Sequence, residues 1–120
     1  MSQFQTREGP DGLVITLDSP VALNDFRSAT FREALYELVL SRPDPRVILD
    51  LSAIDYLSSS GVAILVGLKR RIDQKNGKLV LCRVQPLVCD LLRVMRLNQY
   101  FAFARDEEEA RTLLRPVASA

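Results

Sequence analysis

One stretch near the middle of the chain constrains the fold most. Residues 47–51 form a nearly continuous apolar run, typical of a strand in the middle of a sheet. A polar loop with three consecutive serines follows, and then residues 62–68 are again almost entirely apolar. We expect a helix that begins at about Ser59 and ends at about Gln74. A buried strand followed directly by such a helix indicates a parallel βαβ unit.

The flanking segments extend this pattern. Residues 4–7 and 13–17 predict two strands, and the turn Gly9-Pro-Asp-Gly12 between them indicates an antiparallel hairpin. A helix should follow, with Asn24 or Asp25 at its N-terminus. The remaining expected elements are a strand at 78–83, a helix from Pro86, a strand at 100–104 and a helix capped by Asp106. This order predicts an α/β fold with a mixed, mostly parallel sheet of about five strands and about four helices.

The composition argues against several classes of protein. The chain has 120 residues, of which 48% are hydrophobic and 26% charged, so we expect one globular domain over residues 1–120. A formal net charge of +1 gives no basic surface, and we expect no nucleic-acid partner. The apolar runs are shorter than the ~18 residues that a membrane span needs, so no membrane partner is expected. The N-terminal residues contain no apolar signal core, which predicts a cytoplasmic protein.

The sequence contains no histidine. It therefore lacks the commonest general base and the commonest metal ligand. Its two cysteines, Cys82 and Cys89, do not have the spacing of a zinc site, and no glycine-rich phosphate loop is present. We therefore expect no enzyme, no metal site and no cofactor.

The three serines at the start of the central helix are candidate regulatory residues. The backbone N–H groups in the first turn of a helix lack partners within the helix, and the helix dipole favours negative charge there. A phosphate on a serine at this position would therefore be tolerated. Serines at a helix start also serve simply as N-cap and loop residues, so the pattern alone leaves both roles open.

Helical periodicity of 100° per residue divides the central helix into two sectors. The sector expected to pack on the sheet contains Gly61, Ile64, Leu65, Leu68 and Ile72. The other sector, which we call the serine ridge, contains Ser59, Ala63, Val66 and Arg70. The serine ridge begins at a hydroxyl, continues with small apolar side chains and ends at a basic residue. A partner protein would pack on such a ridge, and a phosphate at its first residue would oppose that packing.

These residues also carry a resemblance to a known family. Asp50-Leu-Ser52, followed by Ser59-Ser-Gly61 at a helix start, resembles the STAS domain of bacterial anti-sigma factor antagonists. Residues 78–86 and 91–97 are similar to the next strand and helix of that family. The resemblance covers residues 12–115 and is most specific at the serine motif.

The resemblance implies which residues form the site. In the family the phosphorylated serine stands two residues before the glycine, which is Ser59 here. Ser58 stands where the family often carries an aspartate, which makes Ser58 the alternative acceptor. Asn24 is near a position where the family often has Asp or Asn, although a plain helix cap explains it equally well. The expected partner-binding residues are Asn24, Asp25, Ser58, Ser60, Gly61, Val62, Ala63, Val66 and Arg70.

The resemblance also implies a function, namely a phosphorylation-controlled protein-binding switch in transcription regulation. The unphosphorylated antagonist would bind a serine-protein kinase/anti-sigma factor, phosphorylation at the helix N-terminal serine would release it, and a PPM-type phosphatase would restore the binding form. The alternative is a constitutive STAS interaction subunit, either a scaffold or an accessory of an ABC lipid-transport complex, without phosphorylation.

A third interpretation, from a different class, is a two-component receiver domain, because Asp50 ends a buried strand. Receivers need an acidic pair after the first strand and a lysine after a late strand. Glu8 before a turn and Arg105 after the final strand do not supply them. Asp50 is better interpreted as a residue that organises the following loop by hydrogen bonding.

Overall fold

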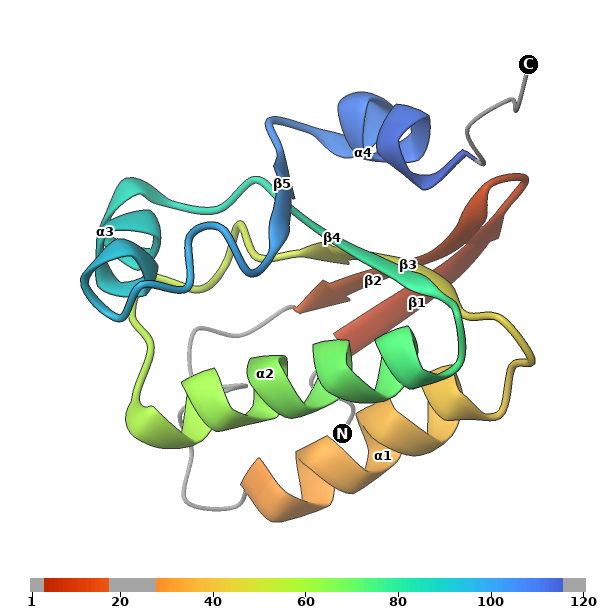
Figure 1. The fold of residues 1–120 in the computed structure, drawn as a ribbon, viewed down its shortest axis with the longest axis horizontal. Helices are drawn as coiled ribbons and strands as arrows, with labels where there is room; N and C mark the ends of the chain where they lie inside the picture. Colours follow the sequence, from red (N-terminus) through yellow and green to blue (C-terminus); the bar gives the residue numbers. More distant parts are fainter. Residues whose placement is uncertain (1–3, 18–27, 116–120) are drawn as a thin grey trace.

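The computed structural model describes residues 4–17 and 28–115, and Figure 1 shows their arrangement. The elements are β1 (Phe4–Gly9), β2 (Gly12–Leu17), α1 (Ser28–Leu40), β3 (Arg46–Asp50), α2 (Ser59–Gln74), β4 (Lys78–Cys82), α3 (Pro86–Val94), β5 (Ala102–Ala104) and α4 (Glu107–Leu114). The predicted order of strands and helices is therefore confirmed over the described residues. The predicted cap residues of α1, Asn24 and Asp25, lie outside them.

The strands form a mixed sheet in the order β1-β2-β3-β4-β5. The first two strands form the predicted antiparallel hairpin, with Gly9 opposite Gly12 at the turn. β2, β3, β4 and β5 pair in parallel. Because parallel strands end at the same edge of a sheet, Asp50 lies beside Cys82 at that edge, and the loop that leads to α2 starts there.

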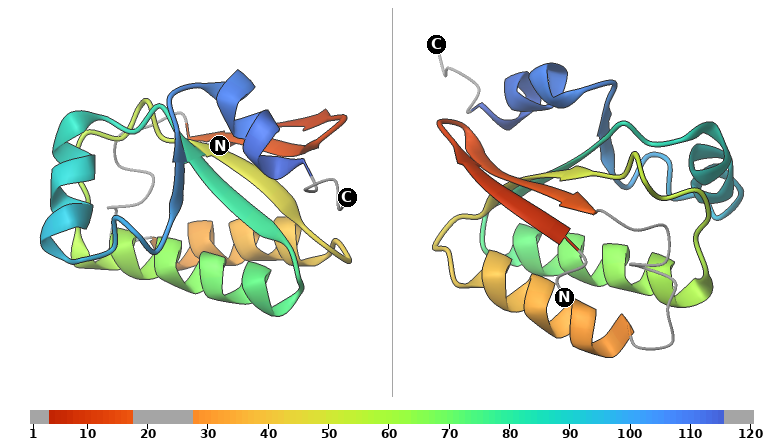
Figure 2. Two further views of the ribbon diagram at one scale, coloured as in Figure 1. Left: turned by 45° about the horizontal axis from the view of Figure 1, so that its top comes forward. Right: turned by 180° about the vertical axis from the view of Figure 1, so that it is seen from behind.

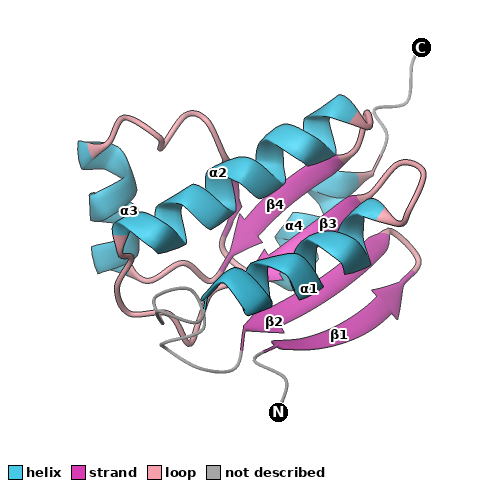
Figure 3. Cartoon of the chain, turned by 90° about the horizontal axis from the view of Figure 1, so that it is seen from below, coloured by secondary structure: helices cyan, strands magenta, loops and turns pink. Residues whose placement is uncertain are grey.

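Helices cover both faces of the sheet. α1 and α2 lie side by side on one face and α4 lies on the other, as Figures 1, 2 and 3 show. The alternation of side chains along β3 explains its continuous apolar sequence: Val47 and Leu49 join the core beneath α1 and α2, and Ile48 packs with Ala110 and Leu114 of α4.

Two local expectations need correction. The last strand is shorter than predicted, because the Tyr100 N–H bonds to the Leu97 carbonyl at 3.0 Å and closes a turn before Ala102. The helical spacing of Ala34, Leu35 and Val39 predicts that all three lie on the buried side of the helix now seen as α1. Leu35 and Val39 are buried, but Ala34 is exposed. Helical spacing therefore predicts which side of a helix is buried, but not where the buried side ends.

Within the described residues, no helix is both long and apolar enough to cross a membrane. The longest, α2, ends at Gln74, where the sequence predicted the stop. Asn76 follows in the left-handed region with φ 58°. A side chain at Gly77 would collide with the Pro45 carbonyl, so this tight turn into β4 requires glycine.

Candidate functional site

The serine that caps α2 is Ser58. Its backbone is extended, with φ −81° and ψ 172°, and its hydroxyl oxygen accepts a hydrogen bond from the Gly61 N–H at 3.1 Å. Its carbonyl accepts the first helical bond, from the Val62 N–H at 3.0 Å. Ser58 is half-buried. Of the three serines, it is the one whose side chain stabilises the start of the helix.

Ser59 and Ser60 are the first two residues of the helix, and both are exposed. The first turn of α2 carries no acidic residue. A negative group on Ser59 would therefore meet the positive end of the helix dipole without repulsion from a carboxylate of the same turn. The geometry provides an exposed hydroxyl at a helix end that favours anions.

The two sectors of α2 are arranged largely as the periodicity predicted. The buried residues of the helix are Gly61, Ile64, Leu65, Leu68 and Ile72, which confirms the sector that packs on the sheet. On the serine ridge, Ala63 and Arg70 are exposed. Val66 is half-buried and contacts the core, as does the neighbouring Val62, so each offers only part of its side chain to a partner.

The structure does not bring the two ends of the serine ridge together. Ser59 and Arg70 are eleven residues apart on one helix, which corresponds to roughly 16 Å along its axis. The guanidinium of Arg70 therefore cannot neutralise a phosphate on Ser59. Such a phosphate would remain a strong, solvated charge next to Ala63.

The loop before α2 is anchored by apolar side chains. Leu51, Ile54 and Leu57 are all buried. The Leu51 N–H bonds to the Cys82 carbonyl at 3.0 Å, and the Ile54 N–H bonds to the Leu51 carbonyl at 2.9 Å. The three buried side chains fix the path of the loop, so that Ser58 and the residues after it have a defined position.

Polar contacts hold the beginning of the same loop. The Asp50 carboxylate accepts a hydrogen bond from the Ser52 N–H at 2.8 Å and lies 3.6 Å from the Arg83 guanidinium. The backbone of Arg83 is in the left-handed region, with φ 54°. The Gln85 side-chain amide donates to the Ser52 carbonyl at 2.7 Å. The loop-organising role expected of Asp50 is thus visible. Sequence reasoning missed Arg83 and Gln85, although both lie in the short connection after β4, the strand that pairs with β3.

A buried thiol, Cys82, lies beside Asp50 at this edge of the sheet. Burial, with a smaller contribution from the nearby Asp50 carboxylate, raises the pKa of the Cys82 thiol to about 12, so Cys82 stays protonated at neutral pH. Over residues 4–17 and 28–115, no group of three or more Cys, Asp or Glu side chains is placed to hold a metal ion. At the start of α2, the exposed hydroxyl groups are those of Ser59 and Ser60.

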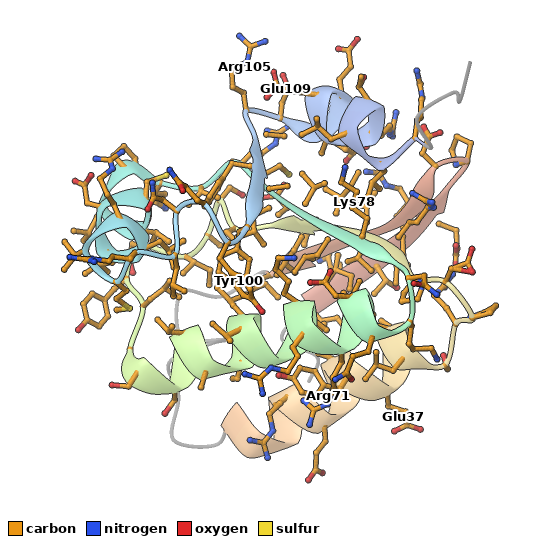
Figure 4. The ribbon with its side chains drawn as sticks, in the orientation of Figure 1. Glu37, Arg71, Lys78, Tyr100, Arg105 and Glu109 are labelled. Carbon is orange, nitrogen blue, oxygen red and sulfur yellow. The ribbon has the colours of Figure 1, made fainter. Side chains whose placement is uncertain are left out.

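A shallow hollow lies elsewhere, after the ends of β4 and β5. It is lined by Arg83, Val84, Cys89, Phe103, Ala104, Arg105 and Glu109. The Arg105 guanidinium donates to a Glu109 carboxylate oxygen at 3.0 Å, so its charge is already paired. Figure 4 shows both residues at the α4 side of the molecule, away from α2. The hollow is therefore not part of the serine site.

Comparisons with known proteins agree with this architecture. The family model described as the STAS domain matches residues 3–110. BtrV of Bordetella bronchiseptica, provisionally named an anti-sigma factor antagonist, is 29% identical over 105 residues, which cover 88% of this chain and 89% of BtrV.

Solved structures show the same fold. The chain is similar to TM1081 of Thermotoga maritima, with a TM-score of 0.85 at 18% identity over 94% of this chain and 95% of that one. It is also similar to the unphosphorylated form of the anti-sigma factor antagonist SpoIIAA, with a TM-score of 0.73 at 20% identity over 92% and 95% of the two chains. A structure of the phosphorylated form of SpoIIAA, from Bacillus, matches with a TM-score of 0.64 at 20% identity over 93% and 99%. Sheet order, helix placement and the family match together show that the chain belongs to the STAS domain family.

Proposed function

We propose that this chain is an anti-sigma factor antagonist whose binding to a partner is controlled by phosphorylation of Ser59. The observation that carries the proposal is the division of roles at the start of α2. Ser58 caps the helix, whereas Ser59 is exposed at its first position and has an apolar neighbour, Ala63, one turn further on. Relatives named as anti-sigma factor antagonists support the same function.

The partner in this proposal is a serine-protein kinase/anti-sigma factor, and a PPM-type phosphatase removes the phosphate. The chain itself acts in the cytoplasm as a substrate and a ligand, without an enzymatic activity of its own. In its unphosphorylated form, Ser59, Ser60, Ala63 and the exposed part of Val66 contact the partner. Asn24 and Asp25 remain predicted contacts, as do Gly61, which is buried, and Val62 and Arg70.

The magnitudes are consistent with a switch. Phosphorylation adds about −1.5 to −2 charges. The end of the helix stabilises a negative charge by roughly 0.3–1 kcal/mol, so the free domain tolerates the phosphate. Inside an apolar contact without an arginine, the same group costs several kcal/mol of desolvation. Because about 1.4 kcal/mol is a tenfold change in affinity, one phosphate decides whether the partner binds.

The experiment is phosphorylation of the purified chain by purified kinases of this class from the source genome. After incubation with ATP and Mg²⁺, mass spectrometry locates any added phosphate. We expect one phosphate on Ser59, none after Ser59→Ala, and normal phosphorylation of Ser58→Ala once its folding has been verified. Phosphorylation at Ser58 alone would contradict the assignment of the acceptor.

The same experiment separates the proposal from its alternative. A kinase or other STAS-binding protein that binds the chain tightly but never phosphorylates it would indicate a constitutive interaction subunit. The alternative has support in one feature of this chain, because a serine stands at position 58, where the family often has an acidic residue.

A further inference from the structure

An apolar stripe lies on the outer side of α3. Four large hydrophobic side chains are strongly exposed among the described residues, and three of them, Leu87, Val94 and Met95, belong to α3 or its C-cap. Their exposed fractions are 52%, 81% and 42%. Isolated apolar side chains are ordinary on a protein surface, but two on one nine-residue helix and a third at its C-cap indicate a contact surface.

Helical spacing joins these residues to Leu91. Leu87, Leu91 and Val94 follow one another at intervals of four and three residues, and Met95 is the next residue of the chain. The buried side of the helix is a separate pair, Val88 and Leu92, which packs into the main core. We call Leu87, Leu91, Val94 and Met95 the α3 stripe. Leu91 is partly buried against the same core, whereas Leu87, Val94 and Met95 are exposed.

The α3 stripe belongs to a helix that lies next to the serine site. In Figures 1, 2 and 3, α3 lies beyond the end of the sheet, close to the N-terminal end of α2. The loop that carries Ser58 runs between the two, and its first residues are bonded to Gln85, which directly precedes α3. A protein that covers Ser59 therefore comes close to α3.

The size of the α3 stripe indicates that it is part of a larger contact. Four partly exposed aliphatic side chains supply on the order of 200–300 Å² of apolar surface. A stable interface buries about 800 Å² on each partner. A second copy bound through this stripe alone would fall well short. A partner that also covers the serine ridge would bury a larger surface than the α3 stripe alone offers.

The charges around the α3 stripe indicate the chemistry of the partner. Arg93 and Arg96 are exposed beside it, and Arg93 makes only a surface pair with Asp90 at 3.3 Å. Asp90 is also exposed and offsets the charge of Arg93, so the rim has one net positive charge, that of Arg96. An apolar patch with an acidic rim is the complementary surface.

We propose that the α3 stripe is a second contact for the kinase/anti-sigma factor partner, through an apolar, acid-rimmed patch of that protein. This inference rests on the proposed function and assigns two parts of the binding affinity to two surfaces. The α3 stripe supplies affinity that does not depend on phosphorylation, and Ser59 supplies the part that does.

The test compares Val94→Asp and Val94→Thr with wild type in titrations against the kinase that phosphorylates Ser59. Val94→Asp places a charge in the apolar contact, so we expect at least a tenfold higher Kd. Val94→Thr keeps the shape of the side chain, and a smaller increase is expected. Thr112→Asp is the matched control, because Thr112 is an exposed β-branched residue of α4, on the other face of the sheet. It should bind like wild type.

The outcomes distinguish this inference from the function on which it rests. A wild-type Kd for Val94→Asp, with normal phosphorylation of Ser59, would overturn the role of the α3 stripe alone. The same holds if sedimentation shows a dimer that Val94→Asp dissociates while kinase affinity is unchanged, because a second copy would then cover the stripe. If no kinase of this class binds the wild-type chain, both proposals fail. Thermal unfolding of each variant verifies that α3 remains folded.

Discussion

The hydroxyl of Tyr36 in α1 donates a hydrogen bond to the backbone carbonyl of Ile64 in α2, at 2.8 Å. Desolvation raises the pKa of Tyr36, so the hydroxyl remains a donor at neutral pH. Gly67 leaves room for this hydroxyl, since a Cβ there would overlap with it. The Arg71 guanidinium lies 4.7 Å from the centre of the tyrosine ring, and Figure 4 shows Arg71 in the layer of α1 and α2. These contacts fix the position of α2, and with it the position of Ser59.

This contact predicts that Gly67→Ala destabilises the wild-type protein but stabilises the Tyr36→Phe variant. Gly67→Ala should destabilise the wild-type protein by about 1–3 kcal/mol, because the added methyl group collides with the Tyr36 hydroxyl. With Tyr36→Phe the collision disappears, and Gly67→Ala should stabilise the protein by up to about 1 kcal/mol through helix propensity. Urea unfolding of the four variants of this double-mutant cycle measures both values. Equal effects of Gly67→Ala in the two backgrounds would refute the proposed contact.

The division of roles between two adjacent serines predicts different effects on stability. Ser58→Ala removes the cap on the Gly61 N–H and should lower the free energy of unfolding by about 0.5–2 kcal/mol. Ser59→Ala should change it by less than about 0.5 kcal/mol, because Ser59 is exposed. Ser58→Asp serves as the control, since aspartate also caps helices. A larger loss for Ser59→Ala than for Ser58→Ala would show that the cap is assigned to the wrong residue.

The buried thiol of Cys82 predicts a loss of stability in alkaline solution. Burial raises its pKa from 9.0 to about 12 in the folded protein. Between these pH values the unfolded chain releases a proton that the folded chain retains, so the free energy of unfolding falls as the pH rises, by up to about 1.4 kcal/mol per pH unit. Below this window the contribution is constant.

The measurement is the difference in unfolding free energy between wild type and Cys82→Ala at neutral pH and at about pH 10. The stability of the wild type should decline more steeply over this interval than that of Cys82→Ala. Cys89→Ala, which leaves Cys82 in place, is the control and should decline as steeply as wild type. If the unfolding free energies of wild type and Cys82→Ala fell equally with pH, the Cys82 thiol would not be the cause of the alkaline loss of stability.

Most of the architecture is predictable from local patterns. The hairpin turn at Gly9–Gly12, the stop at Asn76 and the cap at Asp106 each involve residues whose backbone or side-chain chemistry suits only a few structures. The buried sector of α2 follows from helical periodicity alone. These signals are local, so a single sequence contains them.

The rest depends on tertiary packing. Three consecutive serines can each cap a helix, and only the backbone conformation of Ser58 decides among them. The contacts of Arg83 and Gln85 with the loop before α2 arise from strand pairing between residues about thirty positions apart. The amphipathic sequence of α3 likewise did not indicate which apolar residues would stay exposed, because its position at the end of the sheet leaves only Val88 and Leu92 fully covered.

Charge mimics of phosphoserine should reproduce the switch in part. Ser59→Asp and Ser59→Glu place one negative charge at the exposed start of α2 and should raise the Kd for the partner at least tenfold. Ser59→Ala should bind like the unphosphorylated wild type. A titration of the three variants against the same kinase measures these differences.

The most direct measurement compares the Kd of stoichiometrically Ser59-phosphorylated protein with that of the unphosphorylated protein, for the kinase that adds the phosphate. We predict an increase of at least tenfold upon phosphorylation, with unchanged folding by circular dichroism. Equal Kd values for the two forms would contradict the account.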